Sequence, residues 1–181
     1  GMFRAELTGG SHALSPTELQ DVTQGIAAAR GTIVYSLRRR DTNIWRVTLQ
    51  DGTVADDSDH FVSSTAPDDW PRYSEDGKRI VFRSVRSGTH NVWASDADGR
   101  NPVQLTNLSQ GFASQPVVSP DGKTVGFWAL HEDRGEICMT TVDGGPMNCP
   151  IQDALLLSGP MFSADGTSIY FASGRSGHSQ V

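Results

Sequence analysis

The chain has 181 residues, a formal net charge of -6 and 36% hydrophobic residues. This length allows one domain with a buried core, and the acidic balance excludes broad binding to nucleic acid, which requires a basic surface. No apolar run reaches the roughly 18 residues of a membrane-spanning helix, so we expect no membrane insertion.

The N-terminus lacks the charged, apolar and cleavage-site regions of an export signal. Gly1 before Met2 resembles a remnant of tag removal, which makes Met2 the expected native start. These features favour a cytoplasmic protein. A periplasmic protein from which an export signal has been removed is the alternative.

The first predicted strand, within residues 2–10, alternates apolar and polar side chains as a half-buried strand does. Residues 2–10 align with residues 92–100, so we expect this segment to supply the third and fourth strands of a blade. Residues 15–30 follow, and Ser15-Pro16 resembles a helix start. We expect one helical turn within a loop here; the alternative is a loop leading into an irregular first strand.

Residues 70–107 are expected to form one blade of four antiparallel strands. An apolar run at residues 80–83 has strand length, and residues 91–97 form the next predicted strand. The turns Asp76-Gly77 and Asp98-Gly99 connect the strands. Asp-Gly is favoured at such turns because glycine adopts positive φ without steric cost and aspartate tolerates left-handed conformations.

The same two turns recur along the chain. The first recurs at spacings of 45 and 44 residues, at Asp76-Gly77, Asp121-Gly122 and Asp165-Gly166. The second recurs at spacings of 47 and 45, at Asp51-Gly52, Asp98-Gly99 and Asp143-Gly144. A fixed period in the forties indicates radial or stacked repetition. One aromatic residue in each second strand is expected to pack between neighbouring blades: Tyr35, Phe82, Phe127 and Phe171.

The remaining segments complete the predicted blades. Residues 56–69 form an acidic connection that we expect to be a solvated loop. Residues 112–151 form another blade, and residues 160–181 supply the first two strands of a last one. Since residues 2–10 supply third and fourth strands, we expect the two ends of the chain to combine in one composite blade beside three whole blades.

Cys138 and Cys149 flank the turn at residues 143–145. They are therefore expected to face each other across two paired strands, where Cβ atoms lie about 4.5–5.5 Å apart, near the upper limit for a disulfide. A disulfide and two half-buried thiols both stay open. No base lies nearby in the sequence, which argues against a catalytic pair.

The pattern P-x-x-S-[PEA]-D-G-x-x-I-x-F-x-S-x-R-S-G, then a strand and D-x-D-G-x-x-x-x-L-T, resembles the TolB-like, WD-like β-propeller repeat. The match covers essentially the whole chain and is strongest over residues 71–106. The resemblance implies an all-β propeller of four-stranded antiparallel blades, as a single domain over residues 1–181. Rings of this family usually have more blades than the four predicted here. Four blades closing alone, an eight-bladed ring of two chains and an open fragment of a longer protein are the alternatives.

Candidate ligand-binding residues lie in the predicted loops between second and third strands. A cationic residue or histidine stands four residues beyond each core aromatic, and two of these loops carry a further histidine. The candidates are Arg39, Arg86, His90, His131, Arg175 and His178. Guanidinium groups there suit bidentate contacts to carboxylates or phosphates. The alternative is that each arginine ties its own loop or pairs with nearby acids: Asp56, Asp57, Asp68 and Asp69.

The sequence contains no nucleophile elbow, Walker loop or dinucleotide-binding glycine pattern. Its histidine spacing matches no metal motif, so we assign no catalytic residue, metal or cofactor.

The family that the chain resembles includes the periplasmic TolB protein, which binds proteins. The leading hypothesis is a non-enzymatic scaffold that binds a protein or peptide through its loop face, with a homodimer as one way to close the ring. The alternatives are an enzyme or binding protein acting on anionic polysaccharide, and a stand-alone relative of a peptidase gating propeller.

Overall fold

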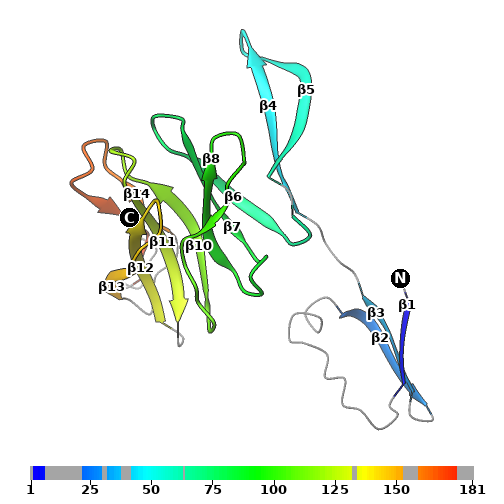
Figure 1. Ribbon diagram of the computed structural model, residues 1–181. Helices are drawn as coiled ribbons and strands as arrows, with labels where there is room; N and C mark the ends of the chain where they lie inside the picture. Colours follow the sequence, from blue (N-terminus) through cyan, green and yellow to red (C-terminus); the bar gives the residue numbers. More distant parts are fainter. Residues whose placement is uncertain are drawn as a thin grey trace. The chain divides into compact units, whose positions relative to one another are not determined.

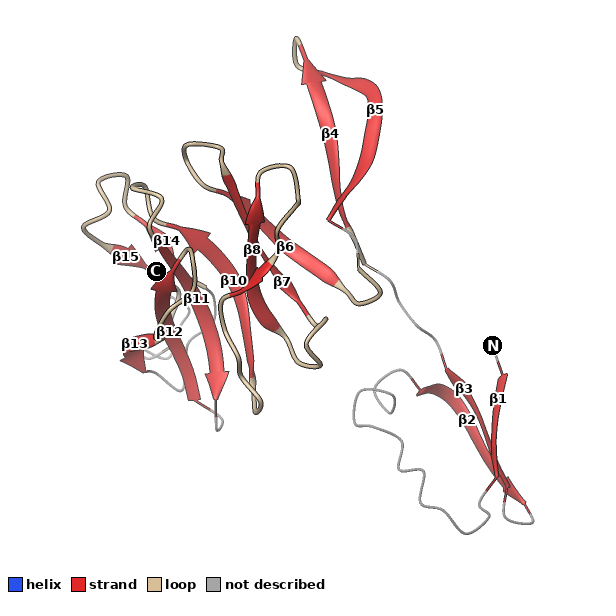
Figure 2. Cartoon of the chain, viewed as in Figure 1, coloured by secondary structure: helices blue, strands red, loops and turns tan. Residues whose placement is uncertain are grey.

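The computed structural model describes residues 2–6, 22–29, 32–37, 42–62, 64–131, 134–152 and 159–174. The chain divides into two compact units, residues 1–41 and 42–181. Every regular element in the described part is a β-strand, which confirms the all-β prediction (Figures 1 and 2). No helix there is long and apolar enough to span a bilayer.

The first unit contains one three-stranded antiparallel sheet in the order β1-β3-β2. Its strands are β1 (Met2–Glu6), β2 (Val22–Ala29) and β3 (Thr32–Leu37). The helical expectation is therefore wrong for residues 22–29, and the irregular strand was the correct alternative. The tight connection between Ala29 and Thr32 brings β2 beside β3, and the ladder of hydrogen bonds outweighs a weak helical preference. Residues 15–21 lie outside the described residues.

Strand β1 pairs with β3, not with the C-terminal strands. Phe3 lies opposite Tyr35, in the register that joins Phe82 to Trp93 and Phe127 to Cys138 in the other sheets. The prediction that β1 acts as a third strand is thus correct, but among the described strands β1 does not join the C-terminal strands in the predicted composite blade. Because β3 carries the same pattern as every second strand, it accepts β1 equally well, and the shorter loop costs less entropy.

The described residues of the second unit form two four-stranded antiparallel sheets and two hairpins. The first sheet consists of β6 (Asp68–Tyr73), β7 (Arg79–Ser84), β8 (Asn91–Asp96) and β9 (Val103–Gln104). The second consists of β10 (Phe112–Val118), β11 (Thr124–His131), β12 (Arg134–Thr141) and β13 (Asn148–Gln152). The hairpins are β4 (Ile44–Gln50) with β5 (Thr53–Val62), and β14 (Met161–Phe162) with β15 (Ile169–Tyr170). Both blades predicted as whole over residues 70–107 and 112–151 are confirmed.

The acidic connection at residues 56–69 is not the solvated loop that the sequence predicts. Residues 56–62 belong to β5, and β6 begins at Asp68. The side chain of Asp68 is fully buried, which composition alone does not indicate. Its burial is explained by an ion pair with a loop arginine that belongs to the candidate site.

A serine and an aspartate stabilise the first turn of each repeat. The Ser74 hydroxyl donates to Asp76 at 2.7 Å and accepts the backbone N–H of Arg79 at 2.9 Å. The same arrangement recurs at Ser119 with Asp121 and at Ser163 with Asp165. The Ser163 hydroxyl, followed by the N–H of Thr167, lowers the pKa of Asp165 to about 2. The repeated Asp-Gly pattern is thus a turn device, as predicted.

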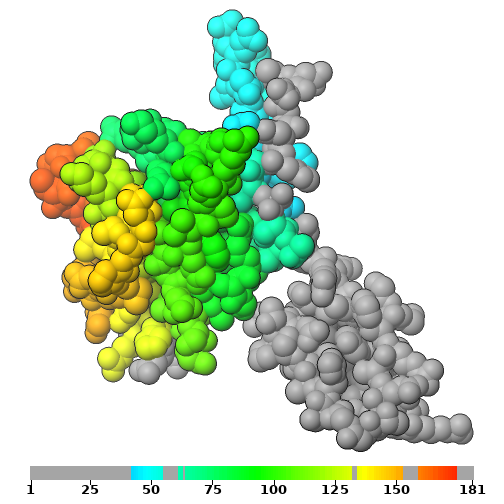
Figure 3. All heavy atoms as spheres, in the orientation of Figure 1, coloured from blue at the N-terminus to red at the C-terminus, as the bar shows by residue number. Residues whose placement is uncertain are grey.

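The core aromatics lie between neighbouring sheets. Phe127 is fully buried with Val81 of the preceding sheet in one apolar cluster. Phe82, also fully buried, packs with Ile44 and Phe61 at the base of the β4–β5 hairpin. The predicted packing is confirmed for these two positions, and Figure 3 shows the two four-stranded sheets, drawn in green and yellow, in direct contact. The side chain of Tyr35 lies outside the described part.

Candidate binding face

The loop between β7 and β8 and the connection from β9 to β10 lie together at one end of the sheet. The Thr89 hydroxyl donates to the carbonyl of Leu108 at 2.7 Å. Asn91 is buried between them: its Oδ1 accepts from the Thr106 hydroxyl at 2.8 Å and from the Leu108 N–H at 2.9 Å. In this sheet, the two connections therefore share one face.

Arg86 is fixed inside its own sheet. Its Nη2 donates to the buried Asp68 at 2.9 Å, and its Nε donates to the Ser84 hydroxyl at 3.0 Å. The guanidinium also lies over the rings of Phe82 and Trp93, 5.2 and 5.0 Å from their centroids. This arrangement is the structural alternative that the sequence left open, because the side chain ties its loop to the sheet.

His90 and His131 are brought to the same end of β10 from different sheets. The carbonyl of His90 accepts the N–H of Ala113 at 2.9 Å, and its ring meets that of Phe112 edge-on at 6.3 Å. His131 is exposed at the end of β11, where its backbone lies against Gly111. Burial, and then the charge of Arg83, lower the pKa of His90 below its usual range. Both effects favour the neutral form of the His90 imidazole.

Arg83 joins the two four-stranded sheets beside His90. Its Nε and Nη2 form a fork on the carboxylate of Asp69, with the Nε contact at 2.7 Å. Its Nη1 donates to the Ser114 hydroxyl on β10 at 3.2 Å. The guanidinium is thus neutralised by one carboxylate, and its side chain keeps 20% exposure. It offers a planar surface and N–H groups rather than net charge.

Two aromatic residues complete this group of side chains. Phe112 and Trp128 meet edge-on at 5.0 Å. The indole Nε1 of Trp128 is buried and has no hydrogen-bond partner among the described residues, a condition that costs free energy. We call the six residues the seam cluster: Asp69, Arg83, His90, Phe112, Ser114 and Trp128. It combines aromatic surface, a guanidinium and a donor that lacks an acceptor.

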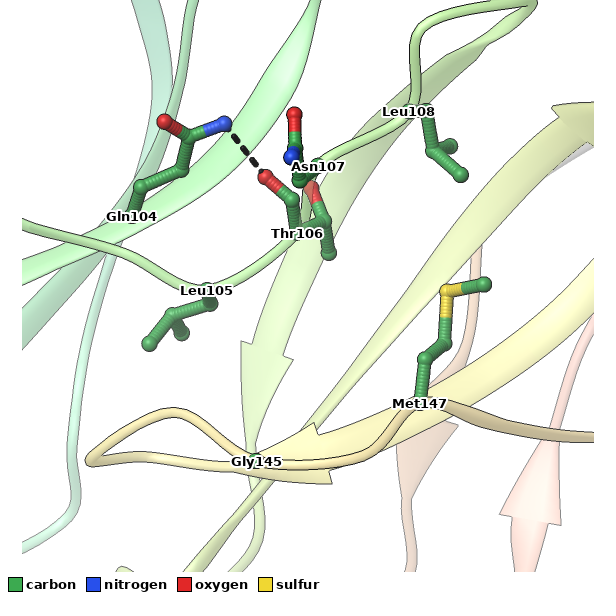
Figure 4. A pocket seen from close by; sticks show the side chains of 7 residues that line it. All are labelled: Gln104, Leu105, Thr106, Asn107, Leu108, Gly145 and Met147. Atoms are coloured by element: carbon green, nitrogen blue, oxygen red, sulfur yellow. Dashed lines mark hydrogen bonds between the residues drawn. The ribbon is translucent and has the colours of Figure 1, made fainter.

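A separate pocket of about 410 Å³ lies between the chain leaving β9 and the connection from β12 to β13. Figure 4 shows the Gln104 amide donating to the carbonyl of Thr106, at 2.6 Å. The lining residues are Gln104, Leu105, Thr106, Asn107, Leu108, Gly145 and Met147. None carries a charge, so the pocket does not provide the cationic site that the sequence suggested.

Three of the six candidate residues fall among the described residues: Arg86, His90 and His131. Arg39, Arg175 and His178 lie outside the described residues. Among the side chains that the structure describes, one group of three could ligate a metal: Glu136, Cys138 and Cys149. The two cysteines form a disulfide between β12 and β13, so the group offers one carboxylate. The sequence left open a disulfide and two half-buried thiols, and the structure has the disulfide.

Sequence reasoning missed Arg83, Phe112 and Trp128. Arg83 and Trp128 directly follow the core aromatics Phe82 and Phe127, at a position that the repeat leaves variable. A charged residue or a tryptophan next to a core aromatic in a buried strand was the available signal. Phe112 carried none, since its role depends on two sheets that are distant in the sequence.

No known family profile matches the chain. Over 51 residues, 28% of the chain, it is 45% identical to the TolB homolog of Chlorobaculum tepidum and covers 12% of that protein. Over 123 residues, 64% of the chain, it is 28% identical to the uncharacterized peptidase YuxL of Bacillus subtilis and covers 18% of it. The chain thus spans less than a fifth of these curated relatives.

Solved structures show the same likeness. The putative TolB of Agrobacterium tumefaciens matches with a TM-score of 0.57 and 25% identity, over 68% of this chain and 47% of that one. TolB of Acinetobacter baumannii matches with a TM-score of 0.62 and 22% identity, over 69% and 31% of the two chains, and shows the fold. In its turns, its strand register and these matches, the chain is similar to TolB proteins, and its fold is that of the TolB-like β-propeller repeat.

Proposed function

We propose that this protein is a non-enzymatic propeller scaffold that binds a protein or peptide partner through the loop end of its blades. Similarity to TolB proteins supports a binding scaffold as the kind of function. The ring is part of the proposal: each chain supplies four blade equivalents, which close alone or as an eight-bladed ring of two chains. A cytoplasmic location stays a prediction.

The seam cluster is the observation that carries this proposal. Tryptophan and arginine are among the residues most enriched where protein partners bind tightly. Here Trp128 packs edge-on against Phe112, and Arg83 bonds to Ser114 on the same strand as Phe112. Trp128 Nε1 is buried and lacks an acceptor among the described residues, so a peptide carbonyl or side-chain oxygen would satisfy it once the side chains covering it move aside. Because Arg83 is already paired with Asp69, the cluster suits a partner with an apolar side chain and a neutral acceptor more than a strongly anionic one.

A selection from a random peptide display library tests the proposal directly. Enriched peptides are expected to lose at least about 30-fold in affinity for Trp128→Ala, the effect of a residue central to an interface. Trp128→Phe keeps the ring and removes the donor, so it should lose less, about 3- to 10-fold. The matched control is Tyr73→Ala, since Tyr73 is an aromatic residue of β6 with 50% exposure outside the cluster.

Two outcomes contradict this function. One is a selection that enriches no peptide on the wild-type protein. The other is a set of peptides that bind Trp128→Ala and Arg83→Ala as tightly as the wild type, while circular dichroism shows both variants folded. Affinity that falls with Tyr73→Ala instead would place the binding surface outside the seam cluster.

A further inference from the structure

The last two strands of the second four-stranded sheet bring three residues of metal-ligand type together. Glu136 and Cys138 are two residues apart on β12, so their side chains share one face of that strand. Cys149 on β13 is joined to Cys138 by the disulfide. One oxygen or sulfur atom from each of the three side chains lies within 4.8 Å of the others. We propose that reduction of the disulfide converts these three residues into a zinc-binding site.

The first four-stranded sheet has different residues at the same three positions. Each ligand-type residue stands 45 residues after its equivalent there, the spacing that also separates the second turns of the two sheets. The equivalents, in chain order, are Asn91, Trp93 and Gln104. Trp93 and Gln104 lie opposite each other on β8 and β9, so the pairing that the repeat provides also brings the two cysteines together. Three positions that differ together, all toward side chains that ligate zinc, favour one shared ligand.

The distances between these side chains fit a tetrahedral zinc ion. Cysteine sulfur binds Zn²⁺ at about 2.3 Å and carboxylate oxygen at about 2.0–2.2 Å, so two ligand atoms of a tetrahedral site are about 3.5–3.8 Å apart. Glu136 Oε2 already lies 3.8 Å from Cys138 Sγ. Reduction breaks the bond between the sulfurs, and two thiols cannot stay at bonding distance. The sulfurs therefore move apart, toward the separation that a tetrahedral ion requires.

The pairing of β12 with β13 permits this movement. Its register shifts between Ile137 and Met139, so the ladder of hydrogen bonds is interrupted beside Cys138. Pro150 directly follows Cys149 and has no backbone N–H to donate. Among the described strands, β13 is also the last of its sheet. The two sulfurs can therefore separate here without the loss of a regular ladder.

The ligand types and their burial favour zinc, bound from one side. Thiolate sulfur is a soft ligand that binds Zn²⁺ in preference to Mg²⁺ or Ca²⁺. Cys138 is fully buried in the core, whereas Cys149 and Glu136 are partly exposed. An ion can therefore enter from the side of Cys149 and Glu136. A water molecule from the same side would complete the four ligands of a tetrahedral site.

The site exists in one redox state because its two thiols are the two cysteines of the chain. A dithiol reductant forms its own disulfide and passes two electrons and two hydrogen atoms to the two cysteine sulfurs. Attack at Cys149 is favoured, since it is more exposed than Cys138. Zinc then binds as the two thiols release their protons to solvent. The oxidised protein keeps only the carboxylate of Glu136 as a ligand.

Zinc affinity measured in both redox states tests the proposal. The protein is titrated with zinc alone, in competition with a chromogenic chelator, before and after reduction by a phosphine, which takes an oxygen atom from water and leaves its hydrogen atoms on the two sulfurs. The oxidised protein keeps all five histidines, so it is the control for zinc held by histidine. We expect the reduced protein to bind zinc at least about 100-fold more tightly than the oxidised protein.

Three variants assign the ligands in the reduced protein. Cys149→Ser should weaken zinc binding at least about 100-fold, and Glu136→Gln, which keeps the shape of the side chain, should weaken it at least about tenfold. The matched control is Glu75→Gln, which alters an exposed glutamate of the first turn and should leave the affinity unchanged. Cobalt(II) in place of zinc should give a thiolate-to-metal absorption band in the reduced wild type.

Three results would overturn the zinc site. The first is equal zinc affinity in the two redox states. The second is an affinity that Glu136→Gln leaves unchanged, since the carboxylate would then not be a ligand. The third is a reduced protein that lacks its native circular dichroism both with and without zinc. No peptide enters these measurements, so this proposal and the proposed function can fail separately.

Discussion

Asn91 is expected to be the most sensitive polar residue of the binding face. Its amide exchanges three well-formed hydrogen bonds, with the Thr89 hydroxyl at 2.8 Å, the Thr106 hydroxyl at 2.8 Å and the Leu108 N–H at 2.9 Å. Each contributes about 1 kcal/mol, and an N–H left without an acceptor costs about 1–2 kcal/mol more. Asn91→Ala should therefore lower the free energy of unfolding by about 4 kcal/mol.

Urea denaturation followed by tryptophan fluorescence measures this change. For a unit of this size, about 4 kcal/mol corresponds to a fall in Tm of about 8–16 °C. The control is Asn107→Ala, which alters an exposed asparagine of the same connection and should change stability by less than about 0.5 kcal/mol. If Asn91→Ala stays within about 1 kcal/mol of the wild type, the hydrogen bonds do not hold the two loops together.

Three further predictions concern turns and the disulfide. Gly99→Ala should lower the free energy of unfolding by about 3 kcal/mol, because the new Cβ would lie 2.3 Å from a carbonyl oxygen. Gly122 is also at positive φ but faces open space, so Gly122→Ala should lower it by about 1 kcal/mol. Thermal denaturation of the two variants compares these effects. Reducing the bond between Cys138 and Cys149, which are 11 residues apart, should cost about 2–3 kcal/mol in urea denaturation with and without reductant. Because the pKa of Asp165 is lowered to about 2, its carboxylate stabilises the folded state at pH values above the unfolded pKa, and this stabilisation is lost as the pH falls toward about 2. Asp165→Asn should therefore flatten the acidic part of a plot of unfolding free energy against pH, measured by urea denaturation.

Local chemistry made much of the fold predictable. Asp-Gly turns depend on positive φ, and Gly77 and Gly122 both adopt it in the structure. Strand alternation then sets the face of each side chain, so that the sequence alone places Phe82 and Phe127 between sheets. Because side-chain direction repeats every two residues, a turn and one core aromatic fix the register of a whole hairpin.

The partner of a strand was less predictable than its position in the blade. Residues 2–6 and 44–50 carry the same pattern, so either can lie beside a second strand in the same register. Pattern alone cannot choose between them, since the choice depends on loop entropy and on packing between sheets. The burial of Asp68 was missed for a similar reason. Its partner Arg86 is 18 residues away, and the pair is identified only once both strands are aligned.

The position directly after each core aromatic connects the fold to the proposed function. The aromatic itself is retained in every repeat, as Tyr35, Phe82, Phe127 and Phe171, whereas the next residue is Ser36, Arg83, Trp128 and Ala172. The backbone of this position is fixed by the same ladder in the complete sheets, while its side chain points to the opposite face from the aromatic. A repeat therefore allows chemistry to vary there without loss of stability. Arg83 reaches Ser114 on β10 and Trp128 packs against Phe112 on the same strand, so the two repeats that depart most from small side chains at this position both contribute to the candidate binding surface.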